Sequence, residues 1–272
     1  MTMKQPLVSR AMELTVKDLD ASNIDDIFRV CSHDRLEDPL QKRGIELKRR
    51  WLNRMLEEHG PCTKIAYLDG RPVAQILYYP EAADPTVAEP RDRVMAIRCT
   101  YNPFQETQKK GISSKLLESV LKECRDGPQS LGGKPTRFAV AQAFETGEGT
   151  SLTNFYASKG FQQGEGEMYL ELHGEYTPRK PTIYDPLPED RSRALIFYDP
   201  VCEWSIGSAV RTEELLKETA PTLHVTTINS WENPQESTRR GGQTLIVNAT
   251  PITATWRDRQ KFTKEVKQAL TK

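Results

Sequence analysis

A strand, a polar turn and an amphipathic helix follow one another directly between residues 93 and 124. Their apolar side chains stand at Val94, Ile97 and Cys99 for the strand and at Ile112, Leu116, Leu117, Val120, Leu121 and Cys124 for the helix. A helix that begins within residues 108–114 presents unpaired backbone N–H groups and the positive end of its dipole. Gly111 lets that backbone approach a ligand closely, and Lys109 and Lys110 add positive charge. The segment therefore predicts a phosphate-binding site.

The pattern Gln108-x-x-Gly111-x-Ser113 resembles the acyl-CoA pyrophosphate loop of the GCN5-related N-acetyltransferases, or GNAT proteins. That loop reads Gln or Arg, two residues, Gly, one residue, then Gly or Ala. Ser113 departs from the pattern, but it is small and its hydroxyl can bind a phosphate. The resemblance implies that acetyl-CoA is bound by Gln108, Lys109, Lys110, Gly111, Ile112, Ser113 and Ser114, and by the backbone of the preceding strand at Cys99 and Tyr101.

A second segment, residues 154–161, is similar to the motif that ends a helix in the same family: an apolar residue, Tyr, three residues, Gly, Phe. Gly160 suits the left-handed residue at a helix end, and Phe161 is expected to pack back against that helix. The resemblance covers residues 12–172 and implies an α/β fold, a mixed sheet flanked by helices. It also implies that Tyr156 protonates the departing thiolate, although packing on the helix is an equal alternative.

The whole chain limits the alternatives. Its 272 residues favour two domains, and 38 Lys plus Arg balance 38 Asp plus Glu, so no basic surface for a nucleic acid is indicated. No apolar run is long enough for a membrane span, and we expect a soluble, cytoplasmic protein. The five cysteines and four histidines are dispersed without metal-ligand spacing, so no metal site is predicted.

The order of predicted elements divides the chain into residues 1–175, a proline-rich linker at 176–193, and residues 194–272. The linker lacks hydrophobic periodicity, which indicates a semi-extended segment. We therefore expect a fragment that ends near Tyr176 to fold alone. The last part reads as strand, helix, strand, then a hairpin and a closing helix.

This last part resembles a thioredoxin-like domain, and more narrowly the YoaP-like domain that is fused to some acetyltransferases. The dithiol position reads Cys202-x-x-Ser205, which excludes electron transfer by a dithiol. At a helix start, Cys202 is expected to have a lowered pKa and to be a reactive or ligand-holding thiol. The alternatives are an ordinary buried cysteine or a degenerate site.

Acyl transfer to an amine needs a bound thioester, a deprotonated nucleophile and a proton donor for the leaving thiolate. Glu145, just beyond a predicted strand, is the candidate base, although it also suits a solvated turn. The sequence does not identify the acceptor; the side chains considered for its pocket are Trp51, Tyr78, Tyr79 and Arg98.

These observations predict an acetyl-CoA-dependent N-acetyltransferase that acts by direct transfer on a small-molecule or peptide amine, with a thioredoxin-like accessory domain. The alternative is a non-catalytic protein that binds CoA or senses thiols, in which Cys202 carries recognition. The oligomeric state is left open.

Overall fold

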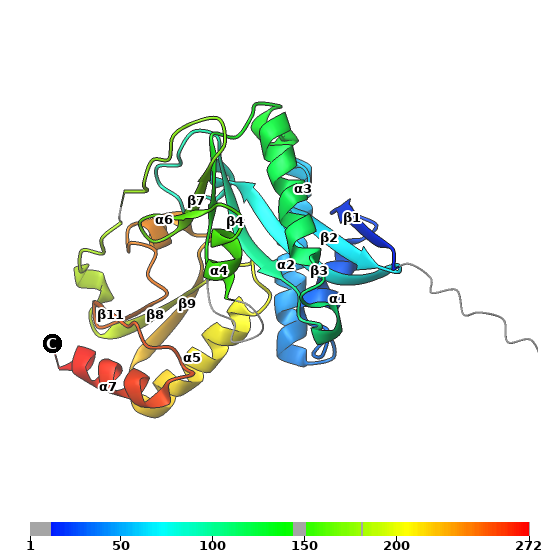
Figure 1. Ribbon diagram of the computed structural model, residues 1–272. Coiled ribbons are helices and arrows are strands. Elements are labelled where there is room, and N and C mark those ends of the chain that lie inside the picture. Colours follow the sequence, from blue (N-terminus) through cyan, green and yellow to red (C-terminus); the bar gives the residue numbers. More distant parts are fainter. Residues whose placement is uncertain (1–11, 144–150, 181, 272) are drawn as a thin grey trace, which may run out of the picture.

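A mixed sheet of seven strands dominates the computed structural model, which describes residues 12–143, 151–180 and 182–271 (Figure 1). Its order is β1-β2-β3-β4-β5-β7-β6, and only β4 and β5 are parallel neighbours. The strands are β1 Leu14–Asp18, β2 Thr63–Leu68, β3 Arg71–Pro80, β4 Val94–Tyr101, β5 Phe138–Ala141, β6 Gln162–Gln163 and β7 Met168–Glu171. The predicted mixed sheet is confirmed, apart from the short strand β6, which was missed.

Helices cover both faces of this sheet (Figure 1). On one face lie α3 (Ile112–Asp126) and α4 (Leu152–Ala157), and on the other α1 (Ile24–Cys31) and α2 (Pro39–His59). The α3 helix buries an apolar stripe against β2 and β3, as its 3.6-residue period predicts. Beyond α4, Gly160 has a φ of +89° and the Phe161 ring lies 5.2 Å from the Tyr156 ring, so the predicted helix end is confirmed.

The β4 strand leaves its neighbours before it ends. Its parallel pairing with β5 stops at Ile97, and β4 then continues to Tyr101 beyond the last of these strand pairs. On its other side the register with β3 shifts at Arg98, which leaves this residue without a partner. This bulge lets Ile97 and Thr100, three positions apart, face the same helices.

A second sheet of four strands has the order β11-β10-β8-β9. The strands β8 (Arg193–Tyr198) and β9 (His224–Asn229) are parallel, and β10 (Leu245–Val247) and β11 (Thr250–Pro251) form a hairpin. The helices here are α5 (Ser205–Thr219), α6 (Pro234–Thr238) and α7 (Arg259–Leu270). The strand, helix, strand, hairpin and helix predicted for this part are present; the five-residue α6 was missed.

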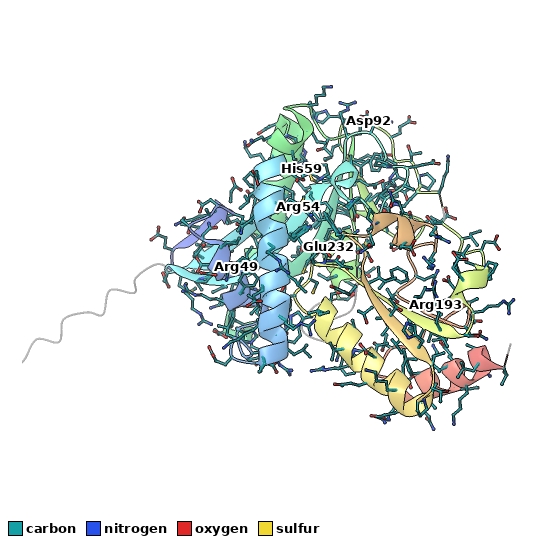
Figure 2. All side chains as sticks on the ribbon, turned by 180° about the vertical axis from the view of Figure 1, so that it is seen from behind. Arg49, Arg54, His59, Asp92, Arg193 and Glu232 are labelled. Carbon is teal, nitrogen blue, oxygen red and sulfur yellow. The ribbon has the colours of Figure 1, made fainter. Side chains whose placement is uncertain are left out.

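The two sheets are joined by a shared apolar core. Trp231 follows β9, and its ring packs edge-on against Trp51 of α2 at 5.4 Å and against Tyr79 of β3 at 6.0 Å. Helix α2 contacts α5 along the same interface (Figure 2). Residues of the last third of the chain thus complete the core beneath α1 and α2, including Val201. We expected residues 1–175 to fold independently of the rest of the chain, and that expectation did not include this packing.

A buried ion pair crosses the same interface. Lys48 of α2 and Glu203 are 3% and 1% exposed, and Lys48 Nζ lies 2.8 Å from Glu203 Oε2. Burial disfavours the charged lysine, but the adjacent carboxylate outweighs this effect and raises the pKa of Lys48. Ser32 Oγ donates to the other carboxylate oxygen at 3.1 Å. At Gly44 a Cβ would lie 1.8 Å from the Glu203 carbonyl oxygen, so glycine permits the close approach.

Residues 176–180 and 182–193 form a strap between the sheets. Arg91 Nη1 donates to the Thr177 carbonyl at 2.8 Å, which fixes the beginning of the strap. At its end Asp190 accepts from Arg240 Nε at 2.8 Å and Nη2 at 2.7 Å, and from the Tyr184 hydroxyl at 2.9 Å. Arg240 and Asp190 are both fully buried. The linker is therefore tethered to both parts of the chain, which its proline content did not indicate.

Candidate functional site

The predicted anion site lies at the start of α3. Gly111 is the N-cap residue, with a φ of +75° and no side-chain cap, and Lys109 also has a positive φ of +59°. This backbone turns the N–H groups of residues 109–114 away from the chain, and none of them donates to another described residue. Such groups at a helix start bind anions. Nothing lies within 4 Å of the position that a Cβ on Gly111 would take, so the approach is open.

A cavity of about 310 Å³ extends from this helix start to the end of β4. It is lined by Thr100, Tyr101, Asn102, Gln108, Lys109, Gly111, Ile112, Ser113, Ser114, Leu152, Asn154, Phe155 and Ser158. One end therefore offers N–H groups and a lysine, and the other offers the part of β4 that lies beyond its pairing with β5. An extended molecule that has an anionic group at one end and amide groups along its length matches both ends of the cavity.

Most of the predicted ligand-binding residues meet in this cavity: Tyr101, Gln108, Lys109, Gly111, Ile112, Ser113 and Ser114. Gln108 acts within the loop, because its Nε2 donates to the Asn102 carbonyl at 3.1 Å. Lys110 does not line the cavity; its side chain is exposed, with Nζ 4.0 Å from Met12 Sδ. The positive charge of Lys110 can therefore attract an anion only from outside the cavity.

Cys99 does not line the cavity, and the contact expected from its backbone stays a prediction. The bulge in β4 places its side chain on the α1 and α2 face, away from the cavity. Gln75 Nε2 lies 3.4 Å from its Sγ, and burial raises the pKa of the thiol to about 11. A period of two counted from Ile97 already gives Cys99 the wrong face, and the sequence carries no signal for a bulge at Arg98.

The Tyr156 side chain does not reach the cavity directly. It is completely buried, and its hydroxyl lies 2.9 Å from Thr100 Oγ1. Burial raises the pKa of Tyr156, so the hydroxyl stays protonated at neutral pH. Thr100 lines the cavity, so its hydroxyl lies between the Tyr156 hydroxyl and the cavity.

Several lining residues were not predicted: Thr100, Asn102, Leu152, Asn154, Phe155 and Ser158. For two of them, Asn154 and Ser158, the sequence carried a helical pattern. Asn154 and Ser158 are four residues apart, so they share a helix face that lies away from the buried Tyr156. Thr100 and Asn102 depend on the bulge and on the strand end, and hence on tertiary structure.

The other predicted residues lie elsewhere. Glu145 falls outside the described residues and stays a prediction. Trp51, Tyr78 and Tyr79, which suit the scaffold as well as an acceptor pocket, are buried in the cores and line neither cavity beside β4. Arg98 does line a cavity, on the opposite face of β4.

Cys202 lies in the turn before α5 rather than at the first turn of the helix. The residue as a whole is exposed, and its N–H donates to Asp199 Oδ1 at 3.3 Å. Desolvation by the surrounding protein and the neighbouring Glu203 carboxylate raise the pKa of this thiol. The expected lowering of the Cys202 pKa is therefore wrong, because helix α5 begins three residues later and the nearest charges include a carboxylate.

Within the described residues, no three His, Cys, Asp or Glu side chains come together in a way that could hold a metal ion. Over the same residues, none of the helices has both the length and the apolar character needed to cross a bilayer.

No protein-family model and no curated protein matches this sequence. Among solved structures, an N-acetyltransferase from Staphylococcus aureus is 12% identical, with 58% of this chain and 98% of that chain covered and a TM-score of 0.43. Ard1 from Thermoplasma volcanium is 12% identical, covering 58% and 97%, with a TM-score of 0.40. A GNAT family acetyltransferase from Brucella melitensis, solved with acetyl-CoA, is 14% identical, covering 62% and 92%, with a TM-score of 0.38. Identities and TM-scores this low assign no activity.

Proposed function

We propose that this protein is an acetyl-CoA-dependent N-acetyltransferase that transfers the acetyl group directly to an amine. The observation that carries the proposal is the single cavity that joins the open helix start at Gly111 to the part of β4 beyond its pairing with β5. The pyrophosphate would accept hydrogen bonds from the N–H groups of residues 111–114. The pantetheine amides would pair with the backbone of β4 after Ile97, as a further strand does at a sheet edge.

In the transfer, the amine nitrogen attacks the thioester carbonyl carbon, and the carbon–sulfur bond breaks as the amide bond forms. The leaving thiolate takes up one proton and the amine nitrogen loses one. We propose that Thr100 gives its hydroxyl proton toward the sulfur and is reprotonated by Tyr156, because the two hydroxyls lie 2.9 Å apart. After CoA leaves, Tyr156 would regain a proton from solvent along the same path through Thr100, and the base would release the amine proton to solvent. Tyr156 thus acts through Thr100 rather than by direct contact. Glu145 stays the predicted base for the amine proton.

The four-stranded sheet supports the thioredoxin-like assignment of residues 194–272 only as a proposal. Its strand order and directions agree with two parallel strands followed by a hairpin. The raised pKa of Cys202 argues against a catalytic thiol at neutral pH. We therefore propose a structural role for this part of the chain.

The proposal is tested by incubating the full chain with ¹⁴C-acetyl-CoA and pools of amines, and measuring both released CoA and radiolabel in amide products. CoA release that matches amide formation supports transfer. Binding of acetyl-CoA with no labelled amide from amino acids, polyamines, aminosugars or peptides would instead favour the non-catalytic CoA-binding alternative. The Gly111→Asp variant measures the background.

A further inference from the structure

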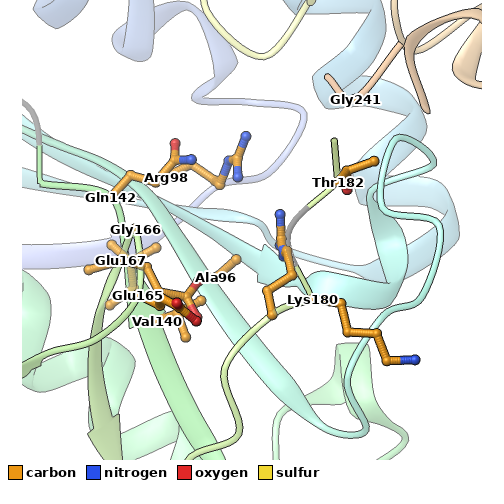
Figure 3. Close-up of a pocket in the computed structure, with 13 residues that line it drawn as sticks. Ala96, Arg98, Val140, Gln142, Glu165, Gly166, Glu167, Lys180, Thr182 and Gly241 are labelled. Atoms are coloured by element: carbon orange, nitrogen blue, oxygen red, sulfur yellow. The ribbon is translucent and has the colours of Figure 1, made fainter. Parts of the chain in front are cut away.

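A second cavity, of about 390 Å³, lies on the opposite face of β4 from the first (Figure 3). Ala96 and Val140 form its floor, on the face of the sheet that α3 and α4 do not cover. In Figure 3, Arg98 and Gln142 lie on the strand side, with Lys180, Thr182 and Gly241 across from them. Beyond Ile97, where the pairing of β4 with β5 ends, Arg98 lines this cavity and Thr100 lines the first.

Two arginines in this cavity have donors that no described residue accepts. The acid nearest to Arg98 is Asp84, at 3.9 Å, which is too long for a hydrogen bond. Asp84 is itself engaged, because its Oδ1 accepts from the Thr86 hydroxyl at 2.6 Å and from the Thr86 N–H at 3.0 Å. Arg179 lies 3.2 Å from Glu81 through Nη2, but its buried Nε has no partner within the described residues. Buried donors normally find acceptors, so Arg179 Nε points to an anionic ligand, and the Arg98 side chain, which is 24% exposed, adds positive charge to the same cavity.

The strap, which carries Arg179 and forms one side of this cavity, is held in place at both ends. Glu81 is 1% exposed and also accepts from Arg91, which anchors the start of the strap at Thr177. On the far side, Gly241 has a φ of +64° and lies against the strap backbone. A Cβ there would be 3.0 Å from the Thr182 carbonyl oxygen. The last third of the chain thus shapes this cavity.

We propose that this cavity binds the acetyl acceptor, and that the acceptor is a small amine that carries a carboxylate, such as an amino acid. This inference rests on the proposed acetyl transfer. The carboxylate would accept from Arg98 and from Arg179 Nε. The exposed Glu165, which also lines the cavity, would balance the ammonium group before it loses its proton. Glu167 does not compete for the ammonium, because it pairs with Arg91 at 2.5 Å.

Saturation-transfer NMR tests this directly, with the full chain and, as probes, the twenty common L-amino acids and their α-carboxamides, each with and without saturating coenzyme A. At least one acid should bind, and its amide, of the same size but without the negative charge, should bind about 10- to 100-fold more weakly. Arg179→Met and the charge-conserving Arg98→Lys should each weaken binding of that acid by a similar factor. Arg125→Met, at an exposed arginine on α3, is the control and should have no effect.

The inference is overturned if no acid binds, if acids and amides bind equally, or if both arginine variants bind like the wild type. The comparison of acids with amides uses the wild type, so it stands even if a variant fails to fold. The titration without coenzyme A does not involve acetyl transfer. Failure of acetyl-CoA binding therefore refutes the proposed function, whereas equal binding of acids and amides refutes only the assignment of the acceptor.

Discussion

Replacing Gly44 by alanine should destabilise this protein, although alanine is the better helix former. Gly44 lies within α2, where Gly→Ala alone stabilises by about 0.5–1 kcal/mol. The new Cβ, however, would lie 1.8 Å from the Glu203 carbonyl oxygen, whereas real Cβ contacts are not shorter than 3.0 Å. The turn that carries Glu203 must then move by more than 1 Å, which separates Glu203 from Lys48. Breaking a buried pair costs about 3–5 kcal/mol, which leaves a net loss of about 2–4 kcal/mol.

The matched control is Gly207→Ala in α5, on the same interface. Its Cβ would meet only Leu40, at 3.8 Å, which is an ordinary contact. This variant should gain about 0.5–1 kcal/mol from helix propensity. Urea unfolding, followed by tryptophan fluorescence and circular dichroism, gives both free energies. If Gly44→Ala stabilises the protein as Gly207→Ala does, α2 and the turn that carries Glu203 are not packed as described. That result would favour the sequence-based expectation of independent domains.

Three further outcomes are expected. A fragment ending at Tyr176 should be insoluble or unfold at much lower urea than the full chain, because Lys48 loses its buried partner; a soluble fragment with a wild-type midpoint would contradict this. Tyr156→Phe and Thr100→Val should each lower kcat by about 10²- to 10⁴-fold with little change in acetyl-CoA affinity. Because the two hydroxyls form one relay, the double variant should be little slower than either single variant. If stopped-flow kinetics show that the two effects multiply, the relay is excluded. Since the pKa of Cys202 is raised, its thiolate fraction at neutral pH is below that of an ordinary thiol. The rate at which iodoacetamide alkylates Cys202, measured by peptide mapping, should therefore still increase above pH 9. A rate that reaches its plateau below pH 8 would contradict the raised pKa.

Local patterns predicted two helix ends well. A helix start followed by an apolar stripe has one geometry, so the Gly111 N-cap and α3 follow from the spacing of a few residues. The same holds for Gly160 and Phe161, where a single left-handed residue ends the helix. The turn at residues 108–111 and the start of α3 could be placed before any tertiary contact was known, and anion binding there stays a prediction.

Features that depend on contacts far apart in the sequence were not predictable. The bulge at Arg98 changes which side chains of β4 face the ligand, and alternation along a single strand gives no sign of it. The same applies to the pair of Lys48 and Glu203, which are 155 positions apart, and to the strap, whose partner Arg240 lies 50 positions beyond Asp190. A proline-rich segment has the composition of a free linker whether or not its ends are tethered.

Calorimetric titration of acetyl-CoA into Gly111→Asp and Gly70→Asp tests the central claim most directly. Both glycines have φ near +80° (75° and 81°), both have nothing within 4 Å of an added Cβ, and both variants add one carboxylate. Only Gly111 lies at the start of α3, whereas Gly70 is in the turn between β2 and β3. The wild type and Gly70→Asp should bind acetyl-CoA with equal affinity, and Gly111→Asp should show no measurable binding, because its carboxylate repels the pyrophosphate. Equal affinities for all three proteins, or no binding by the wild type, would contradict the proposed acetyl-CoA site.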